Sequence, residues 1–236
     1  MQKHTLHLRF WNYSAILKHV ARRTKTMCSM ILLSSLISSP VNANSQIPTD
    51  NDLGKWSAMF YFASTANKTF GDVIIGNFSR YGESLYAIEG TYTLDEQNRF
   101  RQIFAPIFDT VQLAGNITYR HDYHHHDNVA ESNLFVIWRF SRFPWNKYLR
   151  SSIAIGDGLS HAFFHTPYAD REVDQPNSDY SKFLNYLMLE ATFALPAYPH
   201  WQLALRIHHR CTAWGTFPKN ANAGSTSVGI GIRYYF

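Results

Sequence analysis

Hydrophobic and polar residues alternate with a period of two along much of this chain, most clearly in residues 180–236. In the segment 200–211, one parity is apolar, with Trp201, Leu203, Leu205 and Ile207. The other parity is small or polar, with Gln202, Ala204, Arg206 and His208. Because successive side chains of a strand point to opposite faces, this pattern predicts a strand with one apolar and one polar face.

The same reasoning predicts eight strands. They cover 55–64, 84–94, 110–121, 131–140, 149–160, 180–195, 200–211 and 225–236. An apolar outer face opposite a small or polar inner face is typical of a transmembrane barrel strand, although a soluble sandwich also alternates. The expected fold is therefore an all-β, eight-stranded antiparallel transmembrane β-barrel over 55–236. The even number of strands lets both chain termini lie on the periplasmic side.

The connections predict the orientation of this barrel. The turns at 141–148 and 196–199 are short, which suits the periplasmic side, and the longer loops near 65, 122, 161 and 212 would lie outside. Within the first of these loops, a short helix or strand is expected around Val73 to Ile75. The connection 95–109 has no clear form and is longer than a periplasmic turn should be.

Several charged residues fall on the inward parity of the expected strands. They are Glu89, Arg139, Glu190, Arg206 and Arg233. The interior of an eight-stranded barrel is filled by side chains and holds no pore. We therefore expect these residues to pair as a buried ionic network with a structural role.

The net charge of +5 comes from the beginning of the chain. Residues 1–43 hold six basic side chains and no acidic one, so the remainder is close to neutral and nucleic-acid binding is not expected. A basic stretch, an apolar run from Met27 to Ile37 and the small-residue site Val41-Asn42-Ala43 predict a signal peptide, 1–43, cleaved after Ala43. A polar lead-in, 44–54, would follow. An N-terminal anchoring helix is the alternative interpretation.

Cysteine usage agrees with export. Cys28 falls within the leader, so Cys211 would be alone in the mature chain and no intrachain disulfide is possible there.

The candidate site lies at the end of segment 200–211. His209 and Cys211 share the apolar parity, so both would face lipid at the outer end of the strand, with Cα atoms about 6.6 to 6.8 Å apart. A base beside a nucleophile is the minimal unit for acyl transfer. The alternative is an interfacial histidine next to a cysteine that serves as a small apolar residue.

Residues 184–196, the run Arg206 to Cys211 and the closing segment 229–236 resemble the C-terminal half of PagL-like lipid A 3-O-deacylases and their acyloxyacyl-hydrolase-like relatives. That resemblance implies an outer-membrane barrel that removes an ester-linked acyl chain from lipid A, the membrane-embedded part of lipopolysaccharide, without a cofactor. It also implies that His209 is the base and that Cys211 stands where the family has serine. At the position of the family's acid this chain has Ala223, and Asn222 is the candidate that orients the histidine.

Other features have simpler interpretations. The run His121 to Asp127 has residues that bind metal ions but falls in an expected loop, which favours a solvated segment over a metal site. Asp157 has outward parity, but its strand is not next to the strand of Cys211, so it is not assigned to the site. A non-catalytic outer-membrane barrel with a structural or surface-binding role is the alternative function, and an oligomer is possible in either case.

Overall fold

The computed structural model describes residues 53–124, 126–163, 182–213 and 224–236. The expected leader, 1–43, lies outside the described residues, and so does the lead-in 44–54 apart from its last two residues. Among the residues described, no helix combines the length and the apolar character needed to cross a bilayer.

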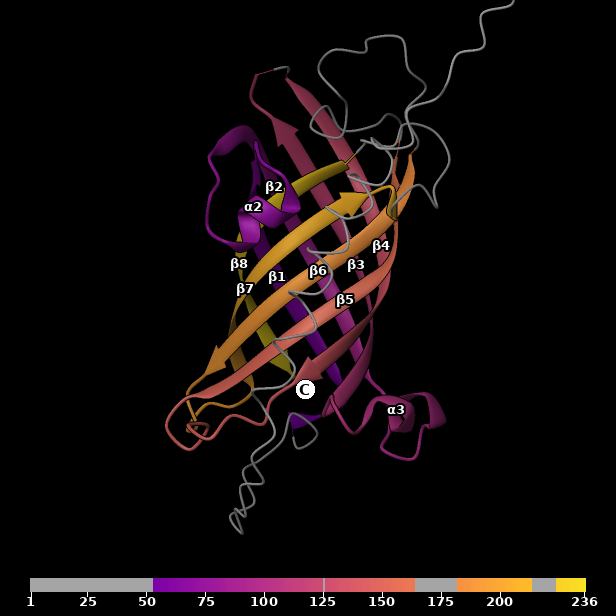
Figure 1. Cartoon of the computed structure of the whole chain (residues 1–236), viewed down its shortest axis with the longest axis vertical. Coiled ribbons are helices and arrows are strands. Elements are labelled where there is room, and N and C mark those ends of the chain that lie inside the picture. The colour runs from indigo at the N-terminus through magenta and orange to yellow at the C-terminus, as the bar shows by residue number, and fades with distance from the viewer. Residues whose placement is uncertain (1–52, 125, 164–181, 214–223) are drawn as a thin grey trace, which may run out of the picture. The chain divides into compact units, whose positions relative to one another are not determined.

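Eight antiparallel strands form a closed barrel (Figure 1). Each strand pairs with the next along the chain, and β1 pairs with β8 to close the sheet. The strands are β1 Trp56–Ala66, β2 Arg80–Thr93, β3 Thr110–Asp122, β4 Asp127–Phe140, β5 Arg150–Ala162, β6 Phe183–Ala194, β7 Trp201–Cys211 and β8 Gly224–Tyr235. This confirms the predicted eight-stranded barrel.

The largest boundary differences lie at one end of the barrel. β2 begins at Arg80 and β4 begins at Asp127, four residues before the expected starts. The β3–β4 ladder continues to the pair Asp122 and Asp127, so residues 122 and 127–130 of the expected His-rich loop belong to strands. Backbone hydrogen bonds extend the ladder past the apolar alternation, because pairing does not require apolar side chains where a strand leaves the lipid.

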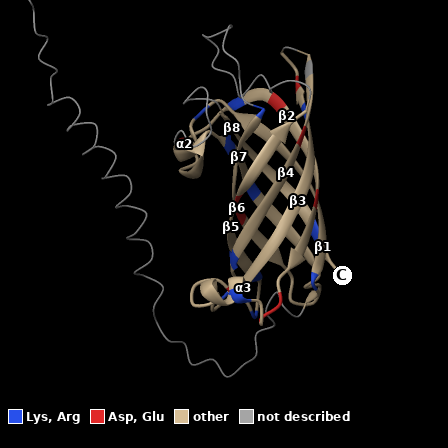
Figure 2. Cartoon of the chain, turned by 90° about the vertical axis from the view of Figure 1, so that its right-hand side faces the viewer, with Lys and Arg blue, Asp and Glu red and all other residues tan. Residues whose placement is uncertain are grey.

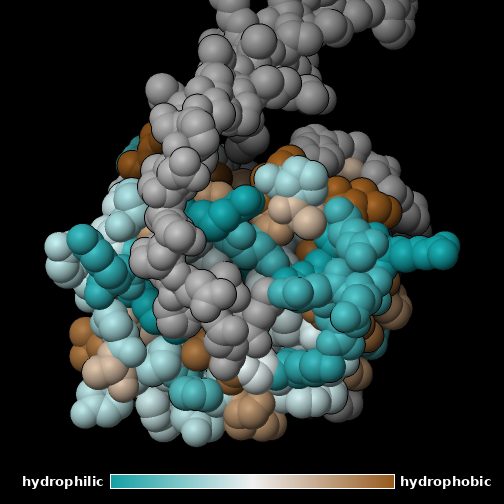
Figure 3. Space-filling model, turned by 90° about the horizontal axis from the view of Figure 1, so that it is seen from below, coloured by the Kyte–Doolittle hydropathy of each residue, from teal (hydrophilic) through white to brown (hydrophobic). Residues whose placement is uncertain are grey.

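The barrel is apolar outside and polar inside. Ile88, Ile117 and Leu134 are 69%, 67% and 73% exposed on the outer face, whereas Glu89 and Asn133 are each 1% exposed inside. Seen from the end that carries the C-terminus, polar residues gather over the described part of the surface, with apolar residues at its rim (Figure 3). This distribution is the reverse of that in a soluble protein and is the one that a bilayer requires of a closed barrel.

The predicted ionic network fills the middle of the barrel and is confirmed. Arg206 donates to Oε1 of Glu89 at 2.8 Å and to Oε2 of Glu190 at 2.8 Å. Arg233 and Arg139 each lie 2.7 Å from Oε1 of Glu190. Basic and acidic residues are visible among the strands in Figure 2. These side chains are fully buried, so each charge depends on its partners for stabilisation.

A second ionic cluster, which the alternation does not predict as a network, lies nearer the end of the barrel that carries Cys211. Arg120 lies 2.7 Å from Glu83 and 3.0 Å from Glu131. Nε2 of His208 lies 2.7 Å from Glu131, which is within ion-pair range although the two groups are not aligned as a hydrogen bond. Nδ1 of His208 contacts the hydroxyl of Tyr61. Alternation placed Arg120 and His208 inside, but their partners follow from the closure of the barrel.

Candidate functional site

The structure places His209 and Cys211 on the outward face of β7, half-buried near its outer end, as the alternation predicts. In the ladders on either side, His209 lies opposite Leu187 of β6 and Thr226 of β8. Cys211 lies opposite Asn185 of β6. The two candidate residues are therefore flanked by polar side chains of both neighbouring strands.

His209 is held from two directions. Its Nδ1 atom lies 2.9 Å from Oγ1 of Thr226, and the ring of Phe70 stacks on the imidazole with ring centroids 4.6 Å apart. Thr226 has outward parity but is only 3% exposed, which shows that this part of β8 is covered. When Nδ1–H donates to Thr226, the lone pair of the imidazole is on Nε2, which is the arrangement that a general base requires.

Phe70 comes from α2, Phe70–Ile74, a short helix in the connection between β1 and β2. The connection was expected to hold a helix or strand around Val73 to Ile75. Thr69 caps the helix by accepting from the backbone N–H of Asp72, and Val73 is 4% exposed. The chain then passes Gly76, whose φ of 79° suits glycine. The cap and the buried Val73 fix the helix beside β8, over His209.

Cys211 contacts an amide that is itself held in place. Its thiol donates to Oδ1 of Asn185 over 3.6 Å, and Nδ2 of Asn185 donates to Asp157 Oδ1 and to the carbonyl of Gly158, both at 2.9 Å. Both amide hydrogens are used, so the amide oxygen stays directed at the thiol. Asp157 lies on a strand that is not next to the strand of Cys211, as expected, but Asn185 on the intervening strand contacts both residues.

The backbone after Cys211 turns sharply. Ala213 has a φ of 45°, a left-handed conformation that is uncommon for residues other than glycine. The expected orienter Asn222, with Trp214 and Gly215, lies outside the described residues.

The sequence carries a signal for Asn185 and Thr226, as it does for Asp157. Asp157, Asn185 and Thr226 are polar residues at outward positions of strands whose outward positions are otherwise mainly apolar. Such exceptions to the alternation cluster around His209 and Cys211 once the barrel closes. From one strand alone, an exception is indistinguishable from a residue at the membrane surface.

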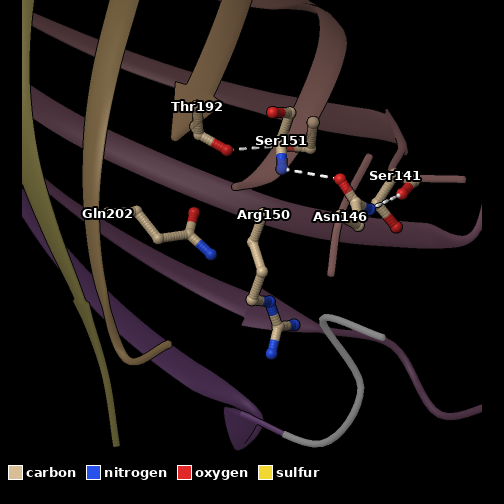
Figure 4. A pocket seen from close by; sticks show the side chains of 7 residues that line it. Ser141, Asn146, Arg150, Ser151, Thr192 and Gln202 are labelled. Atoms are coloured by element: carbon tan, nitrogen blue, oxygen red, sulfur yellow. Dashed lines mark hydrogen bonds between the residues drawn. The ribbon is translucent and has the colours of Figure 1, made fainter. Parts of the chain in front are cut away.

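The His-rich segment and a cavity in the barrel both lie apart from this site. Within the described residues no group of three His, Cys, Asp or Glu side chains could hold a metal ion, and His121 instead bonds Asn128 over 2.6 Å. A small polar cavity lies inside the barrel near the two short turns (Figure 4). Its lining residues are Ser141, Asn146, Arg150, Ser151, Ser152, Thr192 and Gln202. These residues come from the β4–β5 turn and from strand ends on the side of the barrel opposite to Cys211.

The fold and polarity define an integral membrane β-barrel with one outward polar cluster. No protein-family model matches the sequence, and no curated protein matches it. Among solved structures, the outer membrane enzyme PagL has 12% identity over 76% of this chain and 99% of its own, with a TM-score of 0.44. Neisserial surface protein A has 13% identity over 77% and 97%, with a TM-score of 0.43. The outer membrane protein Ail of Yersinia pestis has 12% identity over 77% and 99%, with a TM-score of 0.36. At these identities the likeness concerns the fold alone.

Proposed function

We propose that this chain is an outer-membrane hydrolase that removes an ester-linked acyl chain from lipid A. The observation that carries the proposal is the pair of outward side chains His209 and Cys211 at the outer end of β7, with Nδ1 of His209 held by Thr226. Lipid A would reach these residues laterally from the outer leaflet, so the reaction needs no cavity in the barrel. The resemblance of residues 184–196, 206–211 and 229–236 to lipid A deacylases supports this substrate.

The reaction follows from these groups. Nε2 of His209 takes the thiol proton, and Sγ of Cys211 forms a bond to the ester carbonyl carbon. Backbone N–H groups near Ala213 are the candidate donors to the oxyanion. The ester C–O bond then breaks and the sugar oxygen leaves with the proton from His209. Water, deprotonated by His209, attacks the thioester, which releases the fatty acid and restores the thiol.

The test is mass spectrometry of lipid A from cells with and without the protein. The wild-type chain should cause the loss of one acyl chain, and Cys211→Ala should abolish that loss. Cys211→Ser should keep measurable activity, because serine supplies a hydroxyl at the same place. Leu203→Ala, a change on the same face at the other end of β7, is the matched control and should act as wild type.

The second candidate is a non-catalytic outer-membrane barrel with a structural or surface-binding role. One observation favours it: the thiol of Cys211 donates to the amide oxygen of Asn185, which is not a base. Lipid A that is identical in all these samples, with folded barrel present in each, would support this role and contradict the hydrolase.

A further inference from the structure

A second short helix lies at the opposite end of the barrel from α2 (Figure 2). This helix, α3, covers Arg99–Phe104 in the connection from β2 to β3. Asn98 caps it by accepting from the backbone N–H groups of Phe100 and Arg101. The buried guanidinium of Arg101 donates to the carbonyls of Leu94 at 2.6 Å and Asp109 at 2.7 Å. The helix is therefore fixed to the ends of both strands.

α3 lies against the outer face of the barrel. The ring of Phe104 packs edge-on against Trp138 of β4, with centroids 5.5 Å apart, and Phe100 lies 6.5 Å from the same ring. Val111 has the outward parity of β3 but is 0% exposed. A lipid-facing residue that is completely covered shows that the connection folds back over the barrel wall.

The other side of this connection exposes large apolar side chains. Ile103 is 71% exposed, Ile107 is 63% exposed and Phe100 is 41% exposed. The exposed aromatic residues at the same end of the barrel include Trp56, Trp201, Tyr234 and Phe236. Rings at this level form the girdle that marks a membrane interface in transmembrane barrels. The apolar face of α3 thus continues the lipid-facing surface at the depth of the girdle.

Positive charge is in excess beside this face. The acidic residues nearby are already paired: Asp95 lies 2.5 Å from Lys55, Asp109 lies 2.8 Å from Arg142, and Glu96 lies 3.9 Å from Arg101. Arg99 and Lys147 are exposed basic residues at the same end. A phosphate group would find cations here next to an apolar surface.

We propose that α3 is an interfacial anchor that binds an anionic phospholipid of the inner leaflet. The acyl chain of this lipid lies against Ile103 and Ile107, and its phosphate lies near Arg99. Amphipathic helices with basic and large apolar residues take up this position at bilayer surfaces. The inference depends on the membrane location of the barrel and not on hydrolysis at Cys211, so either proposal can fail without the other.

The test places a fluorophore on α3. Ile103→Cys, in a full-length chain with Cys28→Ser and Cys211→Ser, is labelled with an environment-sensitive dye and folded into vesicles of phosphatidylethanolamine and phosphatidylglycerol. Quenching by doxyl-labelled lipid should exceed quenching by aqueous iodide severalfold. Leu134→Cys on the barrel wall is the lipid-facing control, and Tyr123→Cys in the β3–β4 turn is the water-facing control.

Two outcomes would overturn the anchor. Quenching by iodide like that at position 123 would mean that α3 faces water. Protection from both quenchers would mean that protein, either another part of this chain or a second copy, covers it. Arg99→Gln tests the headgroup: it should reduce quenching by doxyl-phosphatidylglycerol severalfold relative to doxyl-phosphatidylcholine. Equal quenching by the two lipids in the parent chain would contradict the phosphate contact.

Discussion

The imidazole Nδ1 of His209 lies 2.9 Å from the hydroxyl oxygen of Thr226 on the neighbouring strand. The resemblance to lipid A deacylases implies an acid in the orienting role, and in this barrel a neutral hydroxyl contacts the ring. A hydroxyl can hold the tautomer but cannot neutralise an imidazolium, so it orients the base without stabilising its charged form.

The hydroxyl of Thr226 should matter for activity. Thr226→Val keeps the shape but removes the hydrogen bond, and one net hydrogen bond of about 1.4 kcal/mol corresponds to about a tenfold loss in the rate of deacylation. Thr226→Ser keeps the hydroxyl and is the matched control. The measurement is the initial rate of fatty-acid release from lipid A in vesicles. Equal rates for the valine and serine variants would show that Thr226 does not orient His209.

The carboxylate of Asp157 should slow thiol chemistry at Cys211. It accepts from Asn185, which in turn accepts from the thiol, and a carboxylate close to a sulfur repels the negative charge of a thiolate. Asp157→Asn should therefore raise the rate of Cys211 alkylation by N-ethylmaleimide severalfold at neutral pH. Asp95→Asn, a change at the other end of the barrel, should leave that rate as in wild type. An unchanged rate in Asp157→Asn would mean that the carboxylate does not act on the thiol.

Removal of Arg206 should destabilise the barrel strongly. Arg206→Met leaves Glu89 and Glu190 buried with fewer partners, and breaking a buried ionic contact costs about 3–5 kcal/mol. The measurement is the free energy of unfolding in urea with the barrel in vesicles. Arg142→Met removes a half-exposed pair with Asp109 and should cost less than about 1 kcal/mol. Similar losses for the two variants would contradict a dependence on burial.

Phe70 should protect His209 from modification. Because its ring stacks on the imidazole, Phe70→Ala should raise the rate of carbethoxylation of His209 by diethyl pyrocarbonate severalfold, as read by peptide mass spectrometry. Phe78→Ala, an exposed side chain in the same connection, is the control and should not change that rate. The fully buried His208 provides an internal reference. No acceleration in Phe70→Ala would show that α2 does not shield the site.

Much of the barrel could be predicted because strand periodicity is a local property. A strand turns each successive side chain to the opposite face, so a reading of parity alone places Glu89, Glu190 and Arg206 inside and His209 and Cys211 outside. The same rule failed at strand ends such as Arg80, where backbone pairing continues without an apolar signal. It also gave no position for α3, whose fixation depends on Arg101 reaching two distant carbonyls.

The sequence by itself determined the strands, the face of each side chain and the presence of inward charges that must pair. Only the tertiary structure decided which residues of different strands meet: Thr226 with His209, Asp157 with Asn185, and Phe70 with the imidazole. The physical reason is register. Closing eight strands into a barrel sets the stagger between neighbours through backbone hydrogen bonds, and that stagger is a property of the whole sheet.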